Sequence, residues 1–347
     1  MSFLVAPVGC LLAATPGLLI GRVQPVLPLL AIGPLMAATF LGARRTFLVC
    51  CWTVLLALAA GLGESESTHV TAGFAVRWAG LLLGCACSVY AAWQRGRLRE
   101  RLAEAREVAR ITQEAILRPV SRTLSGTHVS TRYHCASRES SVGGDLYDVA
   151  VTPYGLRVLV GDARGHGLDA LRTAADTVTA FRELAYTAPD LTTIARALDA
   201  RLSPRLAPED FVTAVLVEFG PGEVRLVNCG HPAPLRSGRR LELLEPRVPA
   251  LPLGLHPEPR QYRVRLQPGD RLLLYTDGLT ESRAPDGTPF ALLTESATAL
   301  GEPTPDAALH ALYERLLAHA GGPPTDDLAL VLCQPTGVTA PVRVQAT

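Results

Sequence analysis

The sequence contains no lysine, so all 33 of its basic residues are arginine. Schiff-base chemistry, covalent attachment of pyridoxal phosphate and the phosphate-binding loop of the GxxxxGK type each need a lysine. These kinds of site are therefore excluded. The formal net charge of +1 gives no indication of nucleic-acid binding.

Cysteine motifs are also missing, although the chain has eight cysteines. No two of them have the CxxC spacing of a metal or redox site, and no CxxxxxR sequence is present to surround a phosphate. Five lie in the apolar N-terminal part, and Cys135, Cys229 and Cys333 are scattered singly. We expect these cysteines to be reduced, in a chain that faces the cytosol, and to behave as small apolar residues.

Charge is scarce in residues 1–93, which hold four arginines and two glutamates. Apolar runs at 3–21, 23–43, 46–63 and about 70–93 are each near the roughly 20 residues that a helix needs to cross a bilayer. We therefore expect about four transmembrane helices in a multi-pass protein of the cell membrane. A buried helical core domain is the alternative. A signal peptide is disfavoured because no basic segment precedes the first run.

The arginines predict the orientation in the membrane. Arg44 and Arg45 separate the second and third runs, segment 95–101 after the last run is rich in arginine, and the turn at 64–69 has none. Basic residues stay on the cytoplasmic side, so the C-terminal two-thirds of the chain should be cytoplasmic. Segment 95–101 should then lie near anionic membrane lipid.

Residues 94–120 are expected to form a juxtamembrane linker helix, because residues 97–118 contain neither glycine nor proline. Apolar and small side chains recur from Leu98 to Ile116 at alternating spacings of four and three, which is a short heptad pattern. Two interpretations stay open. Either the helix pairs with a second copy in a homodimer, or it packs on the domain that follows.

Residues 121–335 alternate between short apolar segments and turns, a pattern that predicts β-strands. Helical patterns at 167–186, 191–202 and 305–319 are grouped together and do not alternate with single strands. This order predicts an α+β domain of antiparallel sheets covered by helices, and not the βαβ repeat of a dinucleotide-binding fold. The tail at 336–347 has little to pack and is expected to be disordered.

Aspartates stand at the ends of several predicted strands, mostly beside glycine. They are Asp145 in SSVGGDLYDV, Asp162 in VLVGDARGHG, Asp277 in LLLYTDGLTE, and Asp326 with Asp327 in PTDDLALV. Glycine permits close approach of the backbone, and hard cations such as Mg²⁺ and Mn²⁺ prefer carboxylate ligands. A metal pair would explain the set, whereas each motif alone is more typical of a turn.

Taken in order, VGGDLYDV, VGDARGHG, NCGHPAPL, PLGL, LYTDGLTE and DDLALV closely resemble the phosphatase domain of the SpoIIE type. That group is a bacterial branch of the metal-dependent PPM (protein phosphatase 2C-like) family. The resemblance covers about 121–335 and implies an α-β-β-α sandwich of two antiparallel sheets flanked by helices. It implies a protein serine/threonine phosphatase in which two Mn²⁺ or Mg²⁺ ions activate water. The implied substrate is a phosphorylated protein, such as an anti-anti-sigma factor of the STAS type.

The resemblance also implies the metal ligands. These are the carboxylates of Asp145, Asp162, Asp277 and Asp326, with Asp162 bridging, and the backbone carbonyl of Ala163.

Other residues near the motifs keep two interpretations each. Asp148 and Asp327 are either hydrogen-bonded to the ligands or plain strand-end acceptors. His166 is either a general acid or a loop residue. His231 is either a general acid or a packed residue. Arg164 either meets the substrate phosphate or is solvated.

Two other functions compete with a phosphatase. Diguanylate cyclases also contain Gly-Gly-Asp, but there Glu-Phe follows, whereas Leu-Tyr-Asp follows here. The second competitor is a membrane-tethered, catalytically silent binding module of the same fold, and the acidic residues at all four expected ligand positions argue against it.

Overall fold

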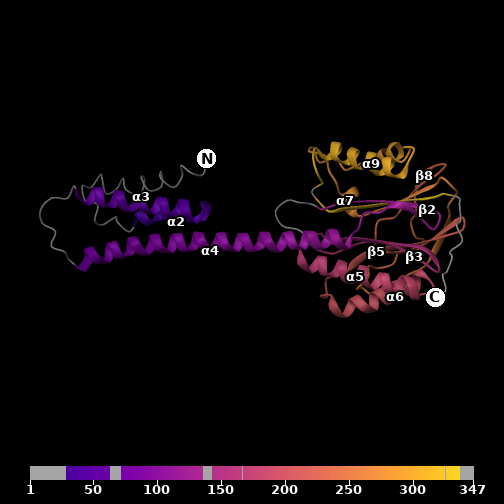
Figure 1. Cartoon of the computed structure of the whole chain (residues 1–347), viewed down its shortest axis with the longest axis horizontal. Helices are drawn as coiled ribbons and strands as arrows, with labels where there is room; N and C mark the ends of the chain where they lie inside the picture. Colours follow the sequence, from indigo (N-terminus) through magenta and orange to yellow (C-terminus); the bar gives the residue numbers. More distant parts are fainter. Residues whose placement is uncertain (1–28, 63–71, 136–142, 166, 325, 337–347) are drawn as a thin grey trace. The chain divides into compact units, whose positions relative to one another are not determined.

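The structure is a computed structural model, and it describes residues 29–62, 72–135, 143–165, 167–324 and 326–336. Its contacts divide the chain into two units, Met1–Ala105 and Arg106–Thr347. Figure 1 labels the elements of both units.

The N-terminal unit is helical. It contains α2 (Ile32–Phe40), α3 (Ala43–Leu62) and the greater part of α4 (Ala72–Ile116). The last apolar run and the linker, which we expected as separate segments, form one continuous helix of 45 residues in α4. This helix ends before Pro119, because proline disfavours the helical conformation of the residue before it.

One helical segment among the described residues, Ala75–Ala105 of α4, is long and apolar enough to cross a membrane. The expectation of four spans is therefore not supported. The first apolar run lies outside the described residues. The described part of the second run forms α2, whose nine residues extend only about 14 Å at 1.5 Å per residue.

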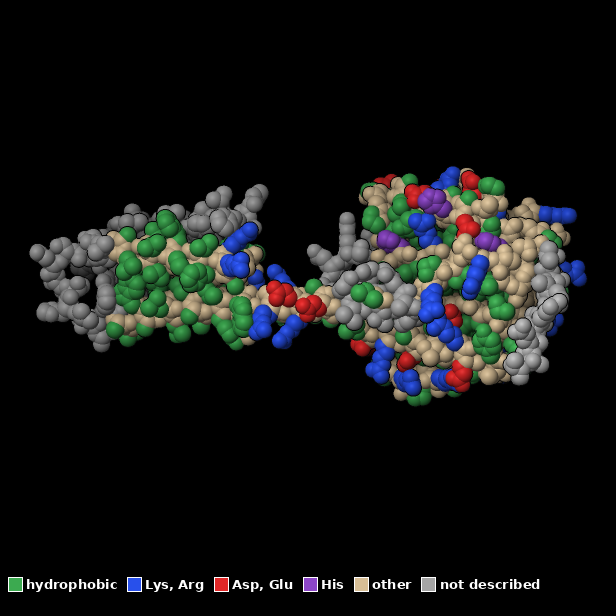
Figure 2. Space-filling view, viewed as in Figure 1, with side chains coloured by type: hydrophobic (Ala, Val, Ile, Leu, Met, Phe, Trp, Pro, Cys, Tyr) green, Lys and Arg blue, Asp and Glu red, His purple; other side chains and the backbone are tan. Residues whose placement is uncertain are grey.

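Large apolar side chains are exposed on this unit, and Figure 2 shows them as a dense green surface. Phe40 is 65% exposed, and Leu48 and Leu83 are exposed to a similar degree. Exposed apolar surface of this extent marks contact with a membrane or with another protein.

The C-terminal unit contains two antiparallel sheets. The six-stranded sheet has the order β1-β2-β11-β10-β7-β8, and the five-stranded sheet has the order β3-β4-β5-β6-β9. The first sheet consists of β1 (Ser121–Leu124), β2 (Thr127–His134), β7 (Leu235–Ser237), β8 (Leu241–Leu243), β10 (Arg271–Tyr275) and β11 (Leu328–Pro335). The second consists of β3 (Asp145–Thr152), β4 (Gly155–Ala163), β5 (Val212–Gly220), β6 (Glu223–Cys229) and β9 (Tyr262–Arg265).

Helices cover the outer faces of the two sheets, as Figure 1 shows. α5 (Leu168–Thr187) and α6 (Leu191–Leu202) pack on the five-stranded sheet, and α9 (Pro305–Ala320) packs on the six-stranded sheet. This unit also contains two short α-helices, α7 (Asp277–Thr280) and α8 (Leu292–Ala299), a 3₁₀ helix at Ser203–Arg205 and the end of α4. The α-β-β-α order of layers confirms the α+β class expected from the sequence.

The helix boundaries follow from capping residues. The side chains of Asp190 and Thr304 accept the backbone N–H groups of Thr193 and Ala307, at the starts of α6 and α9. Helix α9 ends at Gly321, which has a φ of 70° and so adopts the left-handed conformation that glycine tolerates.

A buried arginine joins the five-stranded sheet to the end of α5. The Arg157 side chain is fully buried, and it forms an ion pair with Glu218 at 2.6 Å. The same guanidinium donates to the carbonyl groups of Ala185 and Ala188, both at 2.7 Å. These carbonyls at the end of a helix have no partner within the helix, so Arg157 satisfies them.

Replacing Arg157 by Met is expected to lower the free energy of unfolding by about 3 kcal/mol, because the buried carbonyls and one carboxylate oxygen lose their donor. Urea denaturation followed by circular dichroism measures this. The exposed ion pair of Arg205 with Asp176 provides the control, and Arg205→Met should cost no more than about 1 kcal/mol. Equal losses in the two variants would contradict the structural role of Arg157.

Candidate metal centre

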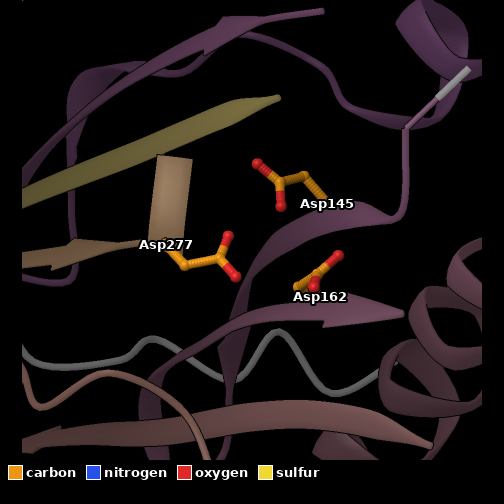
Figure 3. Close-up of side chains that lie close together, drawn as sticks. All are labelled: Asp145, Asp162 and Asp277. Atoms are coloured by element: carbon orange, nitrogen blue, oxygen red, sulfur yellow. The ribbon is translucent and has the colours of Figure 1, made fainter. Parts of the chain in front are cut away.

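Three aspartates converge where the two sheets face each other. Asp145 opens β3 and Asp162 lies near the end of β4, and the two residues are partners across the strand pair. Asp277 follows β10 of the other sheet and opens α7. One carboxylate oxygen from each lies within 4.8 Å of the other two, and Figure 3 shows the three side chains close together. We call Asp145, Asp162 and Asp277 the acidic trio.

A buried threonine, which the sequence analysis missed, orients one member of the trio. Thr276 Oγ1 donates to Asp145 Oδ2 at 2.6 Å and accepts from the backbone N–H of Ala329 at 2.9 Å. The threonine hydroxyl thereby links β11 to the carboxylate of Asp145. Its position immediately before Asp277 is the only sequence feature that points to it.

Close packing requires both glycines that precede Asp145. A Cβ on Gly144 would lie 2.1 Å from the carbonyl oxygen of Ala163, and a Cβ on Gly143 would lie 1.6 Å from a carboxylate oxygen of Asp327. The N–H of Ala163 also donates to the carbonyl of Gly144 at 3.0 Å. The carbonyl of Ala163, expected as a metal ligand, therefore lies against the segment that leads into the trio.

Burial and mutual repulsion raise the pKa of every carboxyl group in the trio. Burial is the largest cause for each, and neighbouring carboxylates add to it. The pKa of Asp162 rises to about 7, and that of Asp145 rises well above its usual range. A divalent cation would favour the ionised form of all three, and oxygen donors in such a cluster fit hard cations.

The structure does not bring Asp326 into the trio, although we expected it among the ligands. Its side chain is exposed, and its Oδ1 accepts from the N–H of Asp327 at 2.8 Å. It is nevertheless close enough to raise the pKa values of Asp162 and Asp277. Its role as a ligand stays a prediction.

Asp327 is buried, and its carboxylate packs against Gly143. Adjacent side chains at the start of a strand point in opposite directions. The two aspartates of the DD motif therefore have different surroundings.

Asp148 faces away from the trio. Since successive side chains of a strand alternate between its faces, Asp148 and Asp145 lie on opposite faces of β3. Asp148 forms an ion pair with Arg182 of α5 at 3.0 Å. The structure therefore favours the interpretation in which Asp148 is not hydrogen-bonded to the proposed metal ligands.

Arg164 and His166, the two other candidates near Asp162, differ in what the structure describes. The Arg164 side chain is exposed, donates to the carbonyl of Glu209 and lies over the ring of Phe211. His166 lies outside the described residues.

His231 is a packed residue. Its Nε2 lies 3.1 Å from the carbonyl oxygen of Tyr275 and its Nδ1 lies 2.9 Å from Thr213 Oγ1. A carbonyl can only accept, so Nε2 carries the proton and Nδ1 accepts from the threonine. Burial lowers the pKa of His231 to about 3. The neutral ring connects the two sheets. Because it does not carry a second proton near neutral pH, it cannot act as a general acid there.

Solved structures similar to this chain include PP2C domains. The SiaA PP2C domain of Pseudomonas aeruginosa is 21% identical, with a TM-score of 0.59, over 68% of this chain and 98% of that chain. The PP2C phosphatase domain of SpoIIE from Bacillus subtilis, solved with a fragment of its regulatory domain, is 17% identical. Its TM-score is 0.51, over 60% of this chain and 62% of that chain. The fold is therefore that of a PP2C-type domain.

Sequence similarity identifies the branch. The family model of stage II sporulation protein E (SpoIIE) matches residues 152–336, and the chain belongs to this family. The match contains Asp162, Asp277 and Asp326 and begins after Asp145. The RsbU and RsbW domains of Rv1364c from Mycobacterium tuberculosis are 26% identical, with a TM-score of 0.56, over 64% of this chain. The chain spans 62% of that structure's length.

Proposed function

We propose that this protein is a membrane-anchored, metal-dependent protein serine/threonine phosphatase. The observation that carries the proposal is the convergence of Asp145, Asp162 and Asp277 from two sheets of a PP2C-type domain. Membership of the SpoIIE family supports the same activity.

The proposed ligands of two Mn²⁺ or Mg²⁺ ions are the acidic trio, the carbonyl of Ala163 and the carboxylate of Asp326. Such a pair of ions, when bound, lowers the pKa of water and neutralises phosphoryl oxygens. The chain itself supplies the fixed orientation. Thr276 holds the carboxylate of Asp145, and the β3–β4 pairing sets Asp145 beside Asp162.

A cysteine nucleophile does not fit the C-terminal unit. The reactive form of cysteine is the thiolate. Burial raises the pKa of Cys135 to about 11 and that of Cys229 to about 12, and it also raises the pKa of Cys333. All three side chains are thiols near neutral pH, which favours direct attack of water over a covalent phosphocysteine.

The proposed organisation is a transmembrane region at 1–93, a linker helix at 94–120, a phosphatase domain at 121–335 and a disordered tail at 336–347. The apolar segment Ala75–Ala105 and the exposed apolar side chains of the N-terminal unit support an anchor. We place the phosphatase domain in the cytoplasm of a multi-pass protein. A homodimer through the linker part of α4 belongs to the same proposal.

The proposed substrate is a phosphorylated anti-anti-sigma factor of the STAS type. The resemblance of the motifs to the SpoIIE type and membership of the SpoIIE family support this class of substrate. This is the most specific part of the proposal, because it names one class of phosphoprotein among many.

The purified full-length chain in detergent should release phosphate from a phosphoserine STAS protein when Mn²⁺ is added, and EDTA should stop the release. A phosphotyrosine protein is the matched substrate control and should remain phosphorylated. If the folded protein binds Mn²⁺ but releases no phosphate from a panel of phosphoserine and phosphothreonine proteins, the silent binding module is correct.

A further inference from the structure

The glycine pair in front of the acidic trio is held by three other elements. The Asp327 carboxylate at the start of β11 packs against Gly143, and the Ala163 carbonyl of β4 packs against Gly144. The third contact comes from α4, where Gln113 Nε2 donates to the carbonyl oxygen of Gly143 at 3.1 Å.

The Gln113 side chain is buried, and both ends of its amide have a partner. Only 2% of its surface is exposed. Its Oε1 lies 4.0 Å from Cys135 Sγ, and because burial raises the pKa of Cys135 to about 11, the thiol is protonated and donates. A donor on Oε1 fixes the amide so that Nε2 faces Gly143. Both ends of this buried amide are therefore engaged.

We propose that Gln113 is a positioning residue for the metal centre. Its side chain fixes the carbonyl of Gly143 and thereby the position of Asp145. The inference rests on the proposed function, because it concerns how the proposed ligands are held. Gly143, Gly144 and Asp145 are consecutive, and glycine has wide backbone freedom. External contacts must therefore hold this segment in one conformation before a metal ion binds.

Loss of the amide leaves the carbonyl of Gly143 buried without its donor, a state that the segment relieves by moving. Movement of Gly143 displaces Asp145 from Asp162 and Asp277. Residues that orient metal ligands typically change metal affinity by about 10-fold to 100-fold when they are replaced. A purely structural glutamine would instead change stability and leave metal affinity as it was.

The test uses Gln113→Leu in the purified full-length chain, with Mn²⁺ affinity measured by isothermal titration calorimetry in the absence of substrate. We expect the affinity to fall about 10-fold or more. We expect kcat at saturating Mn²⁺ to change by less than about threefold, because excess metal restores the same centre. Leu309→Ala is the matched control, since it opens the core beneath α9 and should lower the melting temperature without weakening Mn²⁺ binding.

Equal Mn²⁺ affinity in Gln113→Leu and wild type would overturn this inference but not the proposed function. The same holds if Leu309→Ala weakens Mn²⁺ binding as much as Gln113→Leu does. A folded wild type that neither binds Mn²⁺ nor releases phosphate would overturn the proposed function and this inference with it. If Gln113→Leu does not fold, Gln113→Asn replaces it. The shorter amide cannot reach Gly143, so it should also weaken Mn²⁺ binding, and unchanged affinity would again overturn the inference.

Discussion

Replacing Asp162 or Asp277 by Asn is expected to lower kcat for phosphoprotein hydrolysis by at least about 1,000-fold, which corresponds to roughly 4 kcal/mol of transition-state stabilisation. Asparagine keeps the size of the side chain but removes the charge that the proposed metal pair needs. Both residues belong to the acidic trio, so the two variants should fail alike. Phosphate release from a phosphoserine protein at saturating Mn²⁺ measures the effect.

The matched control is Asp148→Asn, which makes the same chemical change on the opposite face of β3. Asp148 forms an ion pair with Arg182, and loss of this ion pair should change kcat by less than about threefold. Comparable activity in wild type and in both trio variants would refute the assignment of the centre. A large loss in Asp148→Asn would show that the centre extends to the α5 side of the sheet.

The second prediction concerns pH. In the metal-free protein the pKa of Asp162 is raised from its ordinary value near 4 to about 7. Between these two values the folded state holds a proton that the unfolded state has lost. The free energy of unfolding should therefore fall as pH rises through this window, by an amount on the order of 2 kcal/mol between pH 5.5 and pH 7.5.

Mn²⁺ should reverse this trend, because the cation binds the ionised carboxylates and its affinity rises as they lose their protons. The melting temperature of the metal-free protein should be higher at pH 5.5 than at pH 7.5, and the increase caused by Mn²⁺ should be larger at pH 7.5. Asp162→Asn removes the titrating group and also its repulsion of Asp145, so the fall in stability with pH should be smaller in the variant. The same pH slope in both proteins would be the contrary result.

The sequence analysis located most strands and helices of the C-terminal unit because its patterns are local. The strand end predicted at Asp162 in VLVGDARGHG lies near the end of β4, and the helix expected at 191–202 coincides with α6. The short strands β1 and β7 were less evident, since three or four residues carry too little alternation to stand out. Hydropathy was a weaker guide in the N-terminal unit, where the second apolar run is longer than the helix α2 that forms within it.

The sequence by itself determined the candidate ligands, because the motifs that resemble the SpoIIE type occur in order along the chain and contain aspartates at predicted strand ends. Only the tertiary structure decided which of them meet. Strand pairing sets Asp145 beside Asp162, while packing of the two sheets adds Asp277 and leaves Asp326 outside the trio. Thr276 and Gln113 became recognisable for the same reason, since a hydrogen bond between residues far apart in the chain leaves no local pattern.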